Sequence, residues 1–199
     1  MEEILCKWDR EKRDRVINAS FEEFSQKGYE DASTNEIVEK AGISKGLLFH
    51  YFGSKQKLYE TLCDFSVEYV MDLLESGIDW EQRDLFQRVL QITQIKLTAM
   101  EKYPHIYDFL KKITENLSVE EIKNHFSQRM LNLIRRAYEE NIDYTLFRQG
   151  VDLPKAVEII QWTVEGAANK LLRQQDLPMQ EVIKEHEKYM ELLRQLLYA

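Results

Sequence analysis

Apolar residues recur every three or four positions through most of the 199-residue chain. This spacing places them on one face of an α-helix, whereas a half-buried strand would alternate every second residue. The sequence contains no convincing strand, long repeat or low-complexity segment. It therefore predicts an all-α protein of about nine helices, the longest of which cover residues 9–27, 54–76, 80–102, 118–140, 152–175 and 176–197.

Two short helices joined by a tight turn are predicted near the N-terminus. Ser33 followed by Glu36 forms a capping-box pattern that begins the first helix. Gly42 supplies the backbone freedom that a sharp turn needs, and Ser44 begins the second helix, which runs to about Phe52. Two short helices joined by a glycine-containing turn form a helix-turn-helix unit, whose second helix lies in the major groove when it binds DNA.

The second short helix has one side suited to packing and another suited to recognition. Leu48 and Phe52 are four residues apart and are expected to face the core. The other positions combine a cation, a glycine, a histidine and a tyrosine, which packing alone rarely requires. A surface histidine without a role is the plainer alternative for His50. The residues expected on or beside the recognition surface are Lys45, Gly46, Leu47, Phe49, His50 and Tyr51.

Residues from about 13 to 60 resemble the DNA-binding domain of the TetR family of bacterial transcriptional regulators. A run of matched positions is more specific than one short motif. The match departs from the family at Leu47, because a leucine can contact a thymine methyl group but cannot hydrogen-bond a base. The matched positions are Phe24, Gly28-Tyr29, Ser33-Thr34, Ile37, Ala41-Gly42-Ile43-Ser44-Lys45-Gly46, Phe49-His50-Tyr51-Phe52, Lys55 and Leu58.

The resemblance implies a DNA-binding transcriptional regulator, most simply a repressor that a small-molecule effector releases from its operator. It implies a three-helix head over residues 1–54 and a ligand-binding and dimerisation domain over residues 55–199. Thr34, Ser44 and Lys55 are then placed for phosphate contacts, which position a protein on DNA without reading sequence. The expected partner is a double-stranded operator with an inverted repeat.

The last two predicted helices are candidates for a homodimer interface. Each has a broad apolar stripe, and the first carries a patch of small residues where another helix can approach closely. Amphipathic spacing alone fits packing on the chain's own core equally well. The resemblance favours a two-fold four-helix interface, for which the candidates are Gly166, Ala167, Leu171, Val182, His186, Tyr189, Met190 and Leu193.

A largely apolar effector pocket in the helical body is a further expectation from the resemblance. Aromatic residues and methionines at helical spacing more often belong to the core, so packing is the stronger reading for any single residue. We hypothesise that Glu165, one turn after Trp162, faces a cationic effector. The candidate lining residues are Tyr103, Tyr107, Phe126, Met130, Tyr138, Trp162 and Glu165.

The net charge of −8 lies mostly outside the predicted head. Residues 1–57 hold ten basic and eleven acidic side chains, so the head is nearly neutral and its non-specific DNA affinity should be modest. No apolar run approaches the roughly 18 residues of a membrane span. Cys6 and Cys63 offer no disulfide framework, and the first residues lack the apolar core of a signal peptide. We therefore expect a cytoplasmic protein without a membrane partner.

The residue patterns of catalytic and metal sites are not found, so we expect no enzyme activity and no cofactor. Residues 42–46 match the Gly-x-Ser-x-Gly pattern of a hydrolase nucleophile elbow, but that elbow requires a preceding strand, and a helix is predicted there. A hydrolase using Ser44 is a remote alternative. The other alternative is a helical ligand-binding or protein-interaction module that does not use DNA, which Leu47 and the near-neutral head favour slightly.

Overall fold

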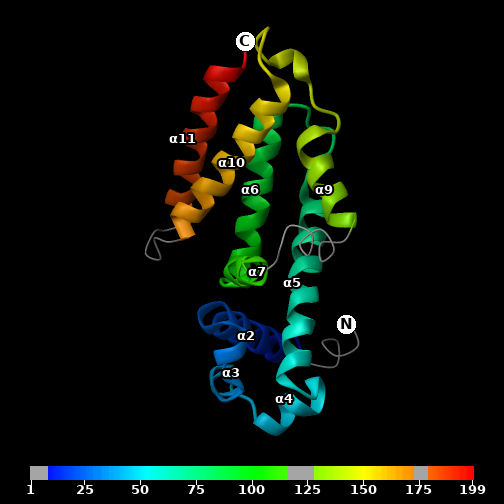
Figure 1. Cartoon of the computed structure of the whole chain (residues 1–199), viewed down its shortest axis with the longest axis vertical. Helices are drawn as coiled ribbons and strands as arrows, with labels where there is room; N and C mark the ends of the chain where they lie inside the picture. Colours follow the sequence, from blue (N-terminus) through cyan, green and yellow to red (C-terminus); the bar gives the residue numbers. More distant parts are fainter. Residues whose placement is uncertain (1–8, 116–127, 173–178) are drawn as a thin grey trace. The chain divides into compact units, whose positions relative to one another are not determined.

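The computed structural model describes residues 9–115, 128–172 and 179–199 (Figure 1). Within these ranges the chain forms nine α-helices and no strand, which confirms the all-α prediction. None of the described helices is long and apolar enough to cross a membrane. The helices are α2 (Arg10–Asp31), α3 (Thr34–Ala41), α4 (Lys45–Phe52), α5 (Lys55–Gly77), α6 (Leu85–Lys102), α7 (Ile106–Thr114), α9 (Gln128–Glu139), α10 (Leu153–Leu172) and α11 (Met179–Leu197).

The helices form two compact units that interleave along the chain. Unit 1 contains the residues up to Leu73 and the segment that begins at Thr98. Unit 2 contains Leu74–Leu97 and Gln128–Ala199. Helices α5 and α6 therefore each contribute to both units. The functional division at residue 54 remains a prediction, and the packing units divide at other positions.

Most predicted helix boundaries match the structure, and the start of α6 is an exception. The sequence predicts a helix from residue 80, but α6 begins at Leu85. The carboxylate of Asp84 accepts the backbone N–H groups of Phe86 at 2.9 Å and Gln87 at 3.3 Å, so Asp84 caps the helix. The predicted start of the helix over 118–140 lies outside the described residues, and α9 covers its later part.

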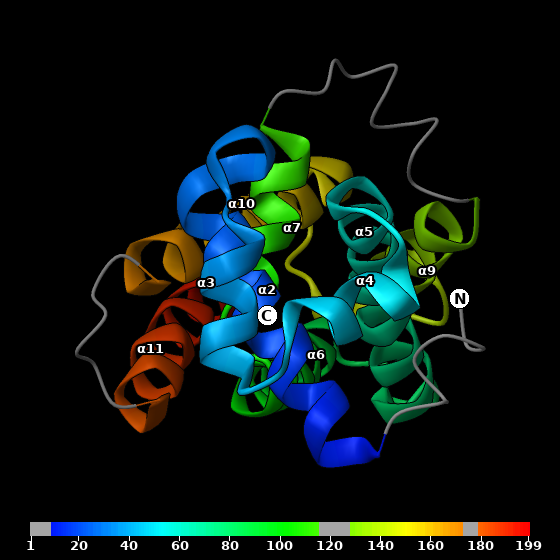
Figure 2. The ribbon, with the colours of Figure 1, turned by 90° about the horizontal axis from the view of Figure 1, so that it is seen from below.

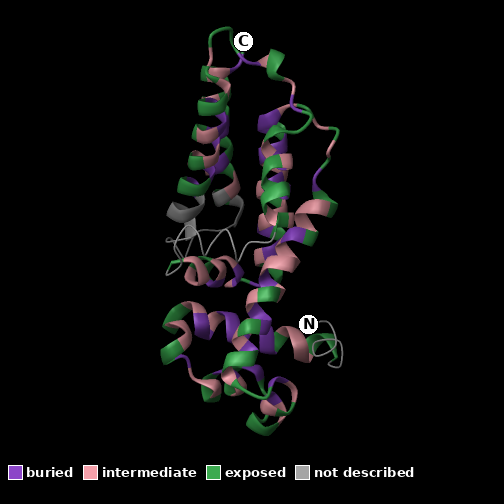
Figure 3. Ribbon diagram, turned by 45° about the vertical axis from the view of Figure 1, so that its right-hand side comes forward, coloured by how far each residue is buried: buried purple, intermediate pink, exposed green. Residues whose placement is uncertain are grey.

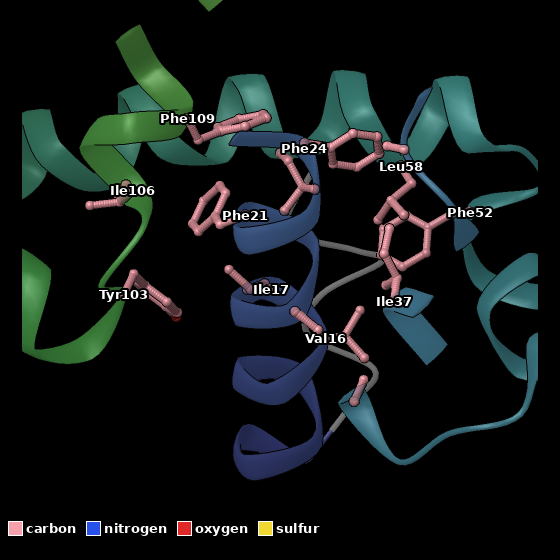
Figure 4. Packing of buried hydrophobic residues seen from close by; sticks show 14 of the residues in the cluster. Val16, Ile17, Phe21, Phe24, Ile37, Phe52, Leu58, Tyr103, Ile106 and Phe109 are labelled. Atoms are coloured by element: carbon pink, nitrogen blue, oxygen red, sulfur yellow. The ribbon is translucent and has the colours of Figure 1, made fainter. Parts of the chain in front are cut away.

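An aromatic cluster forms the centre of unit 1 (Figure 4). Phe21 of α2 packs against Phe109 of α7, with ring centroids 4.9 Å apart, and against the edge of Tyr103 at 5.9 Å. Phe24 lies one turn further along α2 and meets the ring of Tyr59 at 5.1 Å. Such tilted and edge-to-face pairs are favoured by the charge distribution of aromatic rings. The core of the head thus includes residues from α7, more than 80 positions later in the chain.

Three contacts hold the C-terminal end of α6 on α2 within unit 1. The Asn18 side-chain amide donates to the carbonyl of Lys102 at 3.2 Å, which satisfies a free carbonyl at the helix end. The Tyr103 hydroxyl donates to the Asp14 carboxylate at 2.7 Å. The Lys102 ammonium lies 3.5 Å from the same carboxylate. Burial, followed by the bond to Asp14, raises the pKa of Tyr103, so its hydroxyl stays protonated and remains a donor.

Unit 2 is organised around a fully buried arginine, Arg88 of α6. Its guanidinium donates to the carbonyl of Glu140 at 2.6 Å, just after the end of α9, and to the carbonyl of Trp80 at 3.2 Å. It also donates to the carbonyls of Arg136 and Gln82. One side chain therefore satisfies carbonyl groups from the end of α9 and from the turn that precedes α6.

The C-terminus of the chain is fixed to unit 2 by the segment around Phe147. Residues Tyr144–Leu146 form a 3₁₀ turn inside the predicted loop over residues 141–151. The Arg148 side chain donates to the carbonyls of Tyr198 and Gln195, both at 2.6 Å, so it caps the end of α11.

Exposed and buried positions alternate around the helices, as expected for amphipathic helices that share a core (Figure 3).

Replacing Arg88 by methionine should destabilise unit 2. The substitution retains much of the apolar volume but leaves several buried carbonyl groups without a donor, so we expect a loss of about 3 kcal/mol. Urea unfolding followed by circular dichroism measures the loss. Arg83→Met is the matched control, because Arg83 is exposed, and it should change stability by less than about 0.5 kcal/mol. Equal effects of the two substitutions would contradict the role given to Arg88.

Candidate nucleic-acid interface

The turn between α3 and α4 has the geometry that the sequence predicts. Gly42 ends α3 in the left-handed conformation, with φ 65° and ψ 39°, which a residue with a Cβ rarely adopts. The N–H groups of Gly42 and Ile43 return to the carbonyls of Glu39 at 3.1 Å and Val38 at 3.0 Å. Ser44 then caps α4 by accepting the N–H of Leu47 at 3.1 Å. The two helices and their turn are visible in Figure 2.

The start of α3 differs from the predicted capping box. Ser33 precedes α3, but its side chain accepts no capping hydrogen bond. Instead its own N–H donates to the carboxylate of Glu23 at 2.9 Å. Glu23 is almost fully buried, and Lys27 lies 2.9 Å from the same carboxylate oxygen. A side chain of α2 therefore does what the sequence assigned to Glu36.

Helix α4 is divided into a packed side and an outward side. Leu48 and Phe52 are buried in the core of unit 1, as predicted. Lys45, Gly46 and His50 are exposed together with Ser44, whereas the remaining predicted contact residues are half-buried. These half-buried residues are Thr34, Leu47, Phe49, Tyr51 and Lys55.

The side chains on the outward side of α4 contact one another. The Lys45 ammonium lies 6.0 Å from the centre of the Phe49 ring, and the His50 and Tyr51 rings meet edge to face at 5.2 Å. In the described part of the chain, Lys45 takes part in no ion pair. Its charge is therefore available at the start of an exposed helix, where the backbone N–H groups also attract anions.

Lys55 has a structural role that the sequence did not reveal. Its ammonium donates to the carbonyls of Glu30 at 2.9 Å and Ala32 at 3.1 Å, and it lies 4.8 Å from the centre of the Tyr29 ring. These groups belong to the end of α2 and the turn before α3. Two of its three N–H donors are therefore used within the head, which leaves at most one for the phosphate contact predicted for Lys55.

Other basic side chains of the head are also used internally. Arg15 donates to the carbonyl of Ala41 at 3.1 Å, and so caps the end of α3. Lys40 pairs with Glu22 at 2.7 Å. The contact of Arg15 joins residues 26 positions apart, and no local sequence pattern announces it. The nearly neutral charge of the head thus combines internal pairing with a small exposed basic surface on α4.

Comparison with known proteins agrees with this geometry. Residues 16–62 match the family of bacterial regulatory proteins, tetR family. This match spans α2 after its basic start, the helix-turn-helix and the first turns of α5. The helix-turn-helix region of this chain is therefore similar to the corresponding part of tetR-family proteins. Ser44 follows a helix and its turn, and it caps a second helix, which is not the strand–turn–helix setting of a hydrolase nucleophile.

One relative and one solved structure resemble the chain over most of its length. The regulator YdgC of Bacillus subtilis, described as an uncharacterised HTH-type transcriptional regulator, is 26% identical over 171 residues, which cover 81% of this chain and 82% of YdgC. A TetR family regulator from Chloroflexus aurantiacus has the same fold, with a TM-score of 0.66 and 20% identity over 99% of this chain and 98% of that one.

A third similar protein has been solved with a ligand. The transcriptional regulator FadR from Bacillus subtilis, in complex with stearoyl-CoA, matches with a TM-score of 0.62 and 16% identity. The match covers 90% of this chain and 96% of FadR. At this identity the comparison shows a common fold.

The predicted effector residues do not form one group. Tyr103 and Tyr107 belong to unit 1, and Tyr103 is part of its aromatic core. Trp162 of α10 is 65% exposed, so it lies on the surface of the described chain, and its place in an effector pocket remains a prediction. Phe126 lies outside the described residues. The candidates that remain in unit 2 are Met130 and Tyr138, both half-buried, and Glu165, which is exposed.

The predicted dimer residues also need revision. His186 and Met190 of α11 are 3% and 2% exposed, so they pack within unit 2 and offer no surface to a second copy. Ala167 is buried too, Gly166 is exposed, and Tyr189 and Leu193 are half-buried. The side chains of Leu171 and Val182 lie outside the described residues. The large exposed apolar side chains of α10 and α11 are Ile159, Trp162, Leu192 and Leu196.

Replacing Lys55 by alanine should destabilise the head. The substitution removes two charge-assisted hydrogen bonds to the corner between α2 and α3, for which we expect a loss of about 1–2 kcal/mol in unfolding free energy. Thermal and urea unfolding measure it. Lys57→Ala is the control, because Lys57 makes only an exposed pair with Glu60 at 3.5 Å. If Lys55→Ala is as stable as Lys57→Ala, the structural role of Lys55 is wrong.

Proposed function

We propose that this protein is a DNA-binding transcriptional regulator whose α4 enters the major groove of an operator. The observation that supports the proposal is the outward side of α4, where Lys45, Gly46 and His50 are exposed on a helix anchored by two buried side chains. A helix anchored in this way presents its N-terminal residues to base edges without first having to become ordered. The family is one of bacterial regulatory proteins, which agrees with this reading.

The residues at the start of α4 have distinct tasks in this proposal. Ser44 accepts the N–H of Leu47 with its hydroxyl oxygen, so its O–H remains available to donate to a phosphate. Lys45 neutralises a phosphate, and Gly46 allows the backbone to approach closely. Leu47 contributes an apolar contact, for which a thymine methyl group is the natural partner. Thr34, at the start of α3, completes the set of phosphate contacts.

We further propose that the protein acts as a homodimer joined through α10 and α11. A two-fold dimer presents two copies of α4 and gains affinity from two half-sites. The proposed interface is centred on the exposed apolar side chains Ile159, Trp162, Leu192 and Leu196. Tryptophan is typical of the energetically important centre of protein interfaces.

Regulation by a small-molecule effector that binds unit 2 is the remaining part of the proposal. A protein of the same fold, FadR from Bacillus subtilis, has been solved with stearoyl-CoA. An effector releases DNA if it binds more tightly to the conformation in which the two heads do not fit successive major grooves. Repression with release by the effector is the simplest outcome of such a preference.

Selection of bound sequences from a random duplex pool should enrich an inverted repeat. Lys45→Ala should weaken binding to the enriched sequence. It should also lower the slope of log affinity against log salt concentration by about one, because one phosphate contact is lost. Lys155→Ala on α10 is the control, since Lys155 is exposed and pairs with Glu158 at 2.6 Å. A pool that stays random after removal of any co-purified effector would instead favour a module that does not use DNA.

Placing a carboxylate in the proposed interface should separate the dimer. We expect Trp162→Glu and Leu196→Glu to shift the protein to monomers in sedimentation velocity and to weaken operator binding by at least ten-fold. Leu131→Glu is the matched control, because Leu131 of α9 is an exposed leucine away from this surface. Dimers that persist in both interface variants would place the interface elsewhere.

A further inference from the structure

We propose that the effector of this protein is a hydroxy acid, with a carboxylate that binds Lys96 and a hydroxyl that donates to His186, on an apolar body. The inference rests on the proposed function, because it names the ligand class for the regulation assigned to unit 2. It is carried by the buried Nδ1 of His186 on α11, which has no hydrogen-bond partner, and by Lys96, which lies one turn along α6 from Thr93, the residue that His186 contacts at 3.5 Å.

Lys96 is the cation of this polar cluster. It is half-buried on α6, between the buried apolar residues Ile92 and Leu97 and one turn from the buried Ala99. Among the residues that the structure describes, no carboxylate lies within the 4.0 Å of an ion pair with Lys96. The carboxylate that acts on it electrostatically is that of Glu165 on α10. Burial lowers the pKa of Lys96, and Glu165 only partly opposes this effect.

His186 of α11 supplies an acceptor without a donor. Its side chain is buried, and its Nε2 lies 3.5 Å from the Thr93 hydroxyl oxygen. The Thr93 hydroxyl donates to the carbonyl of Val89 at 3.0 Å, so toward His186 it can only accept. Nε2 therefore carries the proton, and Nδ1 is the acceptor. In the described structure this buried Nδ1 has no hydrogen-bond partner.

The surroundings keep His186 neutral. Burial lowers its pKa, and the positive charge of Lys96 lowers it further. A neutral imidazole with Nδ1 unprotonated accepts a hydrogen bond and cannot donate one from that atom. A buried acceptor without a donor is costly, on the order of 1–3 kcal/mol. A ligand that brings a donor to this atom regains that energy.

Tyr138 of α9 belongs to the same cluster. Burial, followed by the negative charge of Glu165, raises its pKa to about 12, so the hydroxyl remains protonated at neutral pH. Its ring packs against the two apolar clusters of unit 2. These two clusters supply apolar side chains beside Tyr138 that are suited to the hydrocarbon part of a ligand, among them Val89, Ile92, Ile160, Val164 and Met190.

The complementary ligand follows from these groups. Lys96 requires an anion, His186 requires a donor, and the apolar surroundings require a hydrocarbon body. A cationic effector facing Glu165, which the sequence suggested, would lie in the field of Lys96 and be repelled by it. A carboxylate and a hydroxyl on one apolar molecule meet all three requirements.

Isothermal titration of the full-length protein with matched compounds tests the inference. The probes are 3-hydroxyoctanoate and mandelate, each compared with its uncharged amide, and 3-hydroxyoctanoate is also compared with octanoate. We expect at least one of the two acids to bind, and we expect its amide to bind at least ten-fold more weakly. If 3-hydroxyoctanoate binds, octanoate should bind several-fold more weakly, because it lacks the hydroxyl. No binding of either acid at millimolar concentration would overturn the proposal, as would equal affinity for an acid and its amide.

Three variants assign these differences to individual residues. Lys96→Met should abolish the preference for acid over amide, and His186→Phe should reduce the contribution of the hydroxyl. Glu165→Gln should strengthen binding of the acid a few-fold, because a like charge is removed. Lys155→Met is the control on an exposed lysine of α10. The assignment of the carboxylate to Lys96 would be overturned if Glu165→Gln lost acid binding or if Lys96→Met kept the preference for acid over amide. If a variant does not fold, the comparison of acids and amides on the wild-type protein still tests the ligand class.

The proposed ligand class and the proposed regulatory function can be disproved independently of each other. Ligand titration requires no DNA, and selection of duplex sequences requires no ligand. Enrichment of an inverted repeat without acid binding would overturn the effector class and leave the regulator intact. Acid binding without DNA selectivity would leave unit 2 as a ligand-binding module and overturn the regulatory function.

Discussion

The attachment of α6 to α2 is the contact on which the DNA-binding head depends. Asn18 caps the last turn of α6, and the Tyr103 hydroxyl reaches the Asp14 carboxylate at 2.7 Å. Tyr103 then leads the chain into α7, whose Phe109 closes the aromatic core around Phe21. The helix-turn-helix is local in sequence, but the core that holds it is not.

The same helix connects the head with the proposed ligand residues. Lys96 lies on α6 in unit 2, and Lys102 lies on α6 in unit 1 beside Asp14. An α-helix is a stiff element, because each turn is held by its backbone hydrogen bonds. The ligand proposed for Lys96 would therefore bind the same helix whose C-terminal end contacts α2.

The sequence predicted what is decided by neighbouring residues. Gly42, the Ser44 cap and the inward side of α4 follow from local backbone chemistry, and the structure confirms them. The sequence did not predict that Glu23 would receive the N–H of Ser33 or that Lys55 would hold the end of α2, because both contacts join distant residues. Amphipathic spacing likewise indicated that α10 and α11 each have an apolar and a polar side. It could not show which apolar residues pack within the chain and which remain exposed. Trp162 is exposed and His186 is buried, and the spacing predicted neither.

The discontinuous composition of unit 1 limits how such a protein can diversify. Recombination that exchanged only the segment before α5 would bring in a new Phe21 and Phe24 without the Tyr59, Tyr103 and Phe109 that surround them. A new DNA specificity is therefore reached more easily by point changes on the outward side of α4, which leave this core untouched. In evolutionary terms, the outward side of α4 can change by point substitution, whereas the core of the head and α7 must change together.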